Sequence, residues 1–102
     1  MNTAGGFGEY IRVPSSWVIN LPKGLTEKDS MILGTAGLTA GLSIQALDDF
    51  NSNSGFEGSS SVVSGSTGGV GSVAVMLLSK LGSSVTAVTG KNTQKELLEA
   101  LG

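Results

Sequence analysis

The sequence predicts an α/β fold built around one parallel β-α-β unit in its second half. Residues 62–63 begin a short β-like run that leads directly into a glycine-rich turn at 65–71. An apolar stretch with a helical pattern continues to residue 81, and a second β-like run occupies 85–88. A parallel pair of strands normally has helices on both faces and further strands beside it, so we expect part of a larger architecture.

The first quarter of the chain has a weaker β-like pattern. Residues 9–21 contain two short runs of strand-forming residues, and Pro14-Ser15-Ser16 separates them. Proline and serine are typical of turns, so this pattern predicts two strands joined by a turn.

Two helices and a loop are predicted next. Thr26 followed by Asp29 matches a helix start, which predicts a short helix over 26–33. Small and apolar residues at 34–50 predict a second helix that buries most of its surface. The Gly/Ser-rich stretch at 51–61 predicts a polar loop.

The helix that follows the glycine turn is apolar on nearly its whole circumference. It should therefore lie between a sheet and another layer, and Gly82 should end it. After the second strand, Thr93 and Glu96 match the Ser/Thr-x-x-Glu capping box, which predicts a last helix that begins at Thr93. Its leucines are expected to point inward; they are Leu97, Leu98 and Leu101.

Composition excludes several classes of function. The chain has neither cysteine nor histidine, which removes disulfides, thiolate nucleophiles, imidazole bases and nearly every zinc site. The net charge is −2 and the six basic residues are scattered, so nucleic acid is not an expected partner. No apolar run reaches the roughly 18 residues of a membrane span, and the N-terminus lacks a secretory-signal pattern. We expect no membrane partner and a cytoplasmic location.

The glycine turn carries the strongest functional signal. A strand that runs into glycines and then a helix can bring backbone N–H groups and the positive helix end to a dinucleotide pyrophosphate. The G-x-G-x-x-G spelling is incomplete, because Ser66 takes the first position when Gly68 and Gly71 are the second and third. The density of glycines favours binding over a purely structural turn. A nucleoside triphosphate P-loop is excluded because no Gly-Lys-Ser/Thr follows, while a methyltransferase-type turn stays open.

The end of the second strand indicates which dinucleotide is bound. An acidic residue about 20 positions beyond the glycines would hold the ribose 2′-hydroxyl of NAD. No Asp or Glu occurs between Gly58 and Lys95, and Thr89, Gly90 and Lys91 occupy that position. An ammonium and a hydroxyl suit a 2′-phosphate, which a carboxylate would repel, so NADPH is favoured over NADH. The alternative for Lys91 is an ordinary exposed loop lysine.

The candidate site residues follow from these two patterns. The predicted cofactor-binding residues are Ser66, Thr67, Gly68, Gly69, Val70, Gly71, Thr89, Gly90 and Lys91. We assign no catalytic residue and no metal ligand. Asp48 and Asp49 are adjacent on a predicted helix and point apart, which excludes a paired acid/base role.

With these residues in hand, the chain resembles the medium-chain dehydrogenase/reductase superfamily. Within it, the likeness is to the zinc-independent quinone oxidoreductase branch and its acrylyl-CoA reductase (YhdH/YhfP-like) group. The stretches that carry the resemblance span almost the whole chain; they are 6–10, 17–22, 34–40, 65–71 and 89–91.

The resemblance implies a two-domain enzyme, of which this chain is a fragment. Residues 1–24 would be the tail of a GroES-like catalytic segment, and residues 25–102 the N-terminal part of a Rossmann-type cofactor-binding domain. The implied fold is a partial Rossmann-type β-α-β-α unit preceded by the end of a GroES-like β segment. By the same resemblance, residues 67–70 would cradle the pyrophosphate and residues 89–91 the adenosine 2′-phosphate of NADPH.

The resemblance also implies an activity. Members of this branch reduce an activated C=C bond, as in acrylyl-CoA or another 2-enoyl thioester, or a quinone, with hydride from NADPH. Zinc-dependent relatives carry a metal-ligand cysteine in the region where Thr35 and Ala36 stand here. We expect a small-molecule substrate, a homodimeric full-length enzyme and an inactive fragment. A non-catalytic nucleotide-binding or structural module is the alternative.

Overall fold

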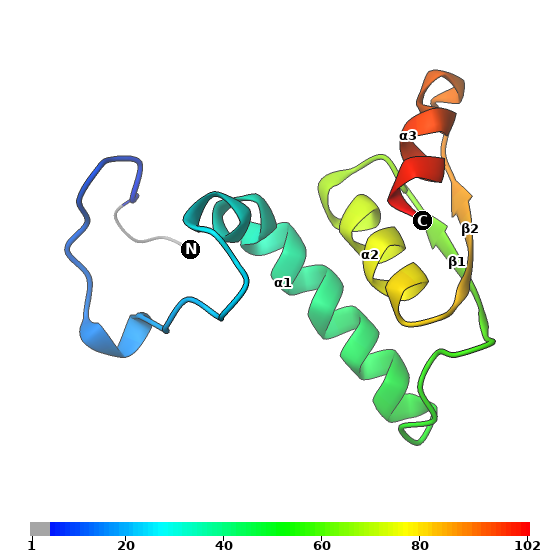
Figure 1. Cartoon of the computed structure of the whole chain (residues 1–102), viewed down its shortest axis with the longest axis horizontal. Coiled ribbons are helices and arrows are strands. Elements are labelled where there is room, and N and C mark those ends of the chain that lie inside the picture. The colour runs from blue at the N-terminus through cyan, green and yellow to red at the C-terminus, as the bar shows by residue number, and fades with distance from the viewer. Residues whose placement is uncertain (1–4) are drawn as a thin grey trace.

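A computed structural model describes residues 5–102, and in these residues it shows a small α/β arrangement (Figure 1). The elements in chain order are a 3₁₀ turn at Ser15–Trp17, α1 at Glu27–Phe50, β1 at Ser60–Ser64, α2 at Gly69–Lys80, β2 at Ser84–Val88, a second 3₁₀ turn at Asn92–Gln94 and α3 at Lys95–Leu101. Strand β1 pairs in parallel with β2, with Ser64 opposite Val88. The predicted β-α-β unit is confirmed.

The core is centred on α2, which contacts α1 and both strands. Helix α2 lies between α1 and the two strands (Figure 1), and its Val75 and Leu78 are buried. The buried cluster is Ile44, Phe56, Val63, Val75 and Leu78. This arrangement fits the expectation that the apolar α2 would lie between a sheet and another layer.

Helix α2 ends where the sequence predicts. Gly82 adopts a φ of 88°, and its N–H donates to the Ser79 carbonyl at 3.1 Å. The Ser83 N–H donates to the Leu78 carbonyl at 3.0 Å. These two bonds form a Schellman motif, in which a glycine in the left-handed region satisfies the last carbonyls of a helix.

The start of α1 also follows the prediction. The Thr26 hydroxyl oxygen accepts the Asp29 N–H at 3.1 Å, and Asp29 accepts the Thr26 N–H at 3.2 Å and the Thr26 hydroxyl at 2.6 Å. These hydrogen bonds, led by the one from the Thr26 hydroxyl, lower the pKa of Asp29 from its ordinary value of 3.8. The range of α1 contains both predicted helices, because the non-helical backbone of Gly34, with φ of 44° and ψ of −149°, separates one helix from the next.

The expectation that α1 buries most of its surface is wrong for the described part of the chain. Only Ala40 and Ile44 are buried on this helix, because they face α2. Large apolar side chains on its other faces are exposed and include Met31, Ile32, Leu38, Leu42, Leu47 and Phe50.

This helix is long and apolar enough to cross a membrane, judged by length and composition. Its most apolar window has a mean hydropathy of 1.3, and 11% of that window is buried. The core helix of a soluble protein can pass the same test, so this is weak evidence of a membrane segment. Polar side chains interrupt the window, and the Thr39 and Ser43 hydroxyls donate to carbonyls one turn back.

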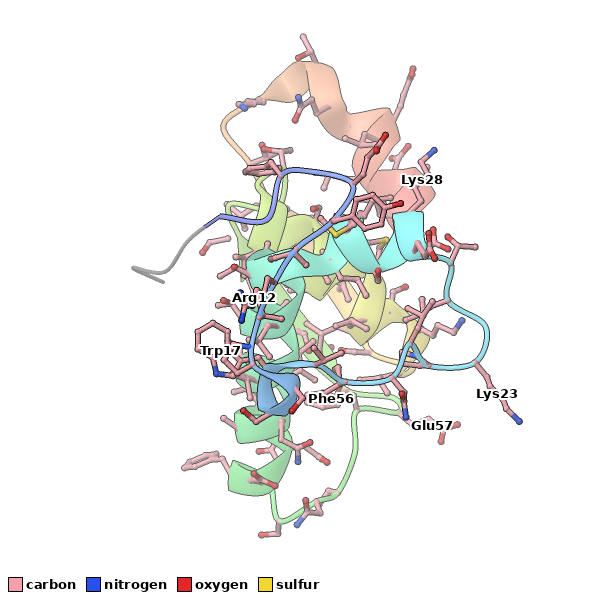
Figure 2. All side chains as sticks on the ribbon, turned by 90° about the vertical axis from the view of Figure 1, so that its left-hand side faces the viewer. Arg12, Trp17, Lys23, Lys28, Phe56 and Glu57 are labelled. Atoms are coloured by element: carbon pink, nitrogen blue, oxygen red, sulfur yellow. The ribbon has the colours of Figure 1, made fainter. Side chains whose placement is uncertain are left out.

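The prediction of two strands within residues 9–21 is wrong. Between residues 5 and 26 the structure contains no strand, and only Ser15–Trp17 forms a 3₁₀ turn. A strand needs a neighbouring strand to satisfy its backbone groups, and the described residues supply none to this segment. Tyr10 and Trp17 are exposed, and Trp17 and Lys23 point away from the helices (Figure 2).

The last helix begins two residues later than predicted. The Gln94 N–H donates to the Lys91 carbonyl at 3.1 Å, which closes a 3₁₀ turn, so Thr93 lies inside that turn and cannot act as the cap. Helix α3 starts at Lys95 without a side-chain cap. Of its leucines, Leu98 is buried and Leu101 partly buried, whereas Leu97 is exposed, contrary to the expectation.

Candidate functional site

The glycine turn connects β1 to α2 by a sharp reversal of the backbone. Gly65 follows the last residue of β1 and adopts a φ of 62°, a region that L side chains rarely occupy. The Gly68 N–H then donates to the Gly65 carbonyl at 2.9 Å. The tight turn is therefore made by Gly65, one position before the start of the glycine spelling read from the sequence.

Gly71 allows the first turn of α2 to lie directly against this reversal. A Cβ atom on Gly71 would overlap the Gly65 carbonyl oxygen and would lie 2.9 Å from the Ser66 Cα. These neighbours are backbone atoms, which cannot move aside without displacing the turn. At Gly68 a Cβ would lie 3.2 Å from the Gly65 carbonyl oxygen, which is also tight.

The N-terminus of α2 leaves backbone donors open. Gly68 is the N-cap and has no side chain to accept from the helix, and the first turn contains no acidic residue. The Ser72 N–H donates to the Gly68 carbonyl at 2.9 Å, so the N–H groups of residues 69–71 precede the first helical hydrogen bond. Open donors and the positive end of a 12-residue helix favour an anion here.

Ser66 is placed differently from its neighbours in the turn. Its side chain is fully buried, with 0% exposed. Its hydroxyl donates to the carbonyls of Val63 at 2.7 Å and Val88 at 3.0 Å, and its N–H donates to the same Val88 carbonyl at 3.3 Å. The hydroxyl therefore points between the strands, away from the open side of the turn.

The structure brings the two predicted stretches together. The Thr67 and Thr89 hydroxyl oxygens lie 3.5 Å apart, so the turn and the end of β2 are in contact. The Thr89 hydroxyl oxygen also accepts the Lys91 N–H at 3.0 Å, which shapes the loop after β2. Thr89 is half-buried, Gly90 and Lys91 are exposed there, and Val70 is exposed at the start of α2.

Two cavities flank this junction. One of about 520 Å³ extends along the open edge of β1 and the glycine turn, and Gly65, Gly68 and Gly71 line it. The other, of about 650 Å³, has an apolar floor from β2 and α3, and Thr89 and Lys91 line its polar side. The predicted pyrophosphate and 2′-phosphate residues thus border open space on both sides of the Thr67–Thr89 contact.

Sequence reasoning missed Lys95. It lines the same cavity as Thr89 and Lys91, and it makes an ion pair with Glu99 at 3.6 Å. Its spacing of four residues after Lys91 was the available signal. In the part of the chain that the structure describes, no group of three or more His, Cys, Asp or Glu could hold a metal ion.

Comparison with known proteins gives strong likenesses over part of their length. The chain is 45% identical over 101 residues to the Escherichia coli protein named "Probable acrylyl-CoA reductase AcuI", covering 99% of this chain and 31% of that protein. It thus spans about a third of this relative. No protein-family model matches.

Solved structures show the same relationship. The yhdH oxidoreductase of Salmonella enterica, crystallised with NADP, matches with a TM-score of 0.84 and 44% identity, over 96% of this chain and 30% of that one. The quinone oxidoreductase of Thermus thermophilus, also solved with NADPH, matches with a TM-score of 0.72 and 26% identity, over 96% of this chain and 31% of that one.

Proposed function

Because the chain belongs to the medium-chain dehydrogenase/reductase superfamily, in its group of acrylyl-CoA reductases and quinone oxidoreductases, we propose that it binds the adenosine side of NADPH in an oxidoreductase. Residues 25–102 are the N-terminal part of its Rossmann-type domain, and residues 1–24 are the tail of its GroES-like catalytic segment. The full-length enzyme is a cytoplasmic homodimer that acts on a small molecule and binds neither nucleic acid nor a membrane.

The observation that carries this proposal is the contact between the glycine turn and the end of β2. A dinucleotide needs a site for its pyrophosphate and a site for its adenosine ribose, held at a fixed separation. The contact between Thr67 and Thr89 places the two proposed subsites next to each other. The turn supplies open N–H groups at residues 69–71, and the absence of a side chain at Gly71 lets the Gly65 reversal pack directly against the start of α2. These residues fit the pyrophosphate.

The loop after β2 fits a 2′-phosphate better than a free ribose hydroxyl. Thr89 and Lys91 offer a hydroxyl and an ammonium beside the same cavity, and Lys91 takes part in no ion pair that the described residues make. A charged donor binds a phosphate more strongly than a neutral one does. In this proposal Ser66 and Gly71 support the turn, and its binding surface is formed by Thr67, Gly68, Gly69 and Val70. Gly90 adds no side chain to the loop after β2.

NADPH bound here would supply hydride, while this chain would position the adenosine half of the molecule. The proposed reaction is zinc-independent reduction of an electron-poor C=C bond conjugated to a thioester, with acrylyl-CoA as the best single substrate and quinones as the other class. The names of the relatives support this choice. Thr35 and Ala36, where zinc-dependent relatives carry a metal-ligand cysteine, support a mechanism without zinc.

The full-length protein, dialysed against a chelator, tests this proposal. We expect loss of nicotinamide absorbance when NADPH is mixed with acrylyl-CoA, and slower or comparable turnover of a simple quinone. A primary alcohol with NADP should give no reaction. Activity confined to the alcohol, or activity that the chelator abolishes, would contradict the zinc-free reductase, and the absence of NADPH binding would favour a non-catalytic module.

A further inference from the structure

We propose that Ser66 is a positioning residue that holds the pyrophosphate turn in register with the loop after β2. This inference rests on the proposed NADPH site and adds a residue whose side chain does not face the cofactor. A glycine at the first position of a dinucleotide turn serves the tight reversal. Here Gly65 makes that reversal with its φ of 62°, so the next position is free to carry a side chain.

The hydrogen bonds of Ser66 connect three parts of the site. The Val63 carbonyl belongs to β1 and the Val88 carbonyl to the last residue of β2, and the hydroxyl has one hydrogen to share between them at 2.7 and 3.0 Å. The Ser66 N–H adds a bond to the Val88 carbonyl at 3.3 Å. Ser66 therefore joins the turn to the end of β2 as well as to β1.

The residues that follow Ser66 and Val88 in the chain are the two whose hydroxyls meet across the site. Thr67 follows Ser66, and Thr89 follows Val88, and their hydroxyl oxygens lie 3.5 Å apart. Loosening the Ser66–Val88 link would let the turn move relative to the loop. A ligand that bridges both subsites would then lose affinity, because its two phosphates require one fixed separation.

The chain supplies a matched control at the other end of the same two strands. Ser83 is also buried, and its hydroxyl bonds with those of Ser59 at 3.0 Å and Ser61 at 2.7 Å. A Ser83→Ala change removes a buried hydroxyl network next to β2 but lies at the amino end of the sheet, away from the turn. Both variants should lower the unfolding midpoint, and only one should alter binding.

The test measures two ligands by calorimetry in the full-length protein. Adenosine 2′,5′-bisphosphate reaches both subsites, whereas adenosine 2′-monophosphate reaches only the loop after β2. We expect Ser66→Ala to weaken the bisphosphate about fivefold to tenfold, the range that one lost buried hydrogen bond supports. The monophosphate should change less than twofold, and Ser83→Ala should change neither ligand by more than twofold.

Three outcomes would overturn the inference. One is an equal loss for both ligands with Ser66→Ala, and another is a bisphosphate affinity in Ser66→Ala that matches Ser83→Ala. If the unsubstituted protein binds neither ligand, the proposed function fails together with this inference. Should Ser66→Ala not fold, Ser66→Cys keeps the buried volume with a weaker donor, and its bisphosphate loss should be smaller but still selective.

Discussion

The hydroxyl oxygens of Thr67 and Thr89 lie 3.5 Å apart, although the two residues are 22 positions apart in the sequence. This contact exists because β1 and β2 are parallel and in register, so that both chains leave the sheet at the same edge. Ligands of open α/β sheets bind outside the carboxyl ends of the strands. Substitutions at this edge should therefore alter cofactor binding, whereas matched changes elsewhere should not.

The Lys91→Glu variant of the full-length protein should raise the Michaelis constant for NADPH at least tenfold. A charge-assisted hydrogen bond contributes about 1.5–3 kcal/mol, and about 1.4 kcal/mol corresponds to a tenfold change. The constant for NADH should change much less, because NADH has no 2′-phosphate to repel. Steady-state kinetics with both cofactors measure the two constants.

The control for Lys91 is Lys28→Glu, which changes the net charge equally but lies in the first turn of α1, where it points outward (Figure 2). It should leave both Michaelis constants within twofold. Equal effects of Lys91→Glu on NADPH and NADH would show that Lys91 does not bind the 2′-phosphate.

Gly71→Ala should destabilise the protein and weaken NADPH binding together. The new Cβ would overlap the Gly65 carbonyl oxygen, so the turn must shift, and overpacking of this kind costs about 1–3 kcal/mol. Gly41→Ala is the matched control, because a Cβ at that helical position meets open space and should stabilise α1 by about 0.5–1 kcal/mol. Chemical denaturation and NADPH titration of both variants would decide; unchanged binding in Gly71→Ala would contradict the close approach.

The start of α1 should lose stability as the solution is acidified below pH 3.8. The hydrogen bonds from Thr26 lower the pKa of Asp29 in the folded state, so its contribution is present above the unfolded value of 3.8 and is lost as pH falls through the lowered one. In Thr26→Ala the pKa of Asp29 should rise back toward 3.8. NMR titration of the Asp29 carboxyl measures this, and an unchanged pKa in the variant would contradict the capping box.

The 102-residue chain studied alone should associate in solution. Leu38 and Leu42 are about 60% exposed on α1, and exposed apolar side chains of this kind favour association. Sedimentation velocity should show a mean mass that rises with concentration. The double variant Leu38→Lys, Leu42→Lys should reduce this association, and a stable monomer with a cooperative melt in the unsubstituted chain would contradict the prediction.

Local signals in the sequence were sufficient for the elements whose hydrogen bonds are local. The Thr26–Asp29 capping box, the end of α2 at Gly82 and the strand-turn-helix-strand order at 60–88 are all present in the structure. Each depends on backbone conformation and on contacts within a few residues, which the residue types specify directly. The stretches expected to bind the pyrophosphate and the 2′-phosphate rest on the same kind of local pattern, and their role in binding stays a prediction.

The remaining features depend on partners that are distant in the chain. The β-like pattern at 9–21 forms no strand among the described residues, because a strand requires a neighbour, and α1 buries only the side chains that α2 covers. The capping box expected at Thr93 does not form, because the Lys91 carbonyl accepts the Gln94 N–H and closes a 3₁₀ turn there. In the sequence, Ser66 was only a departure from the first glycine of the G-x-G-x-x-G motif. In the structure, the parallel pairing of β1 and β2 places the Val63 and Val88 carbonyls around its hydroxyl. The residue types alone determined the turn and the loop, and the tertiary structure decided how they meet, because strand register sets the distance between residues far apart in sequence.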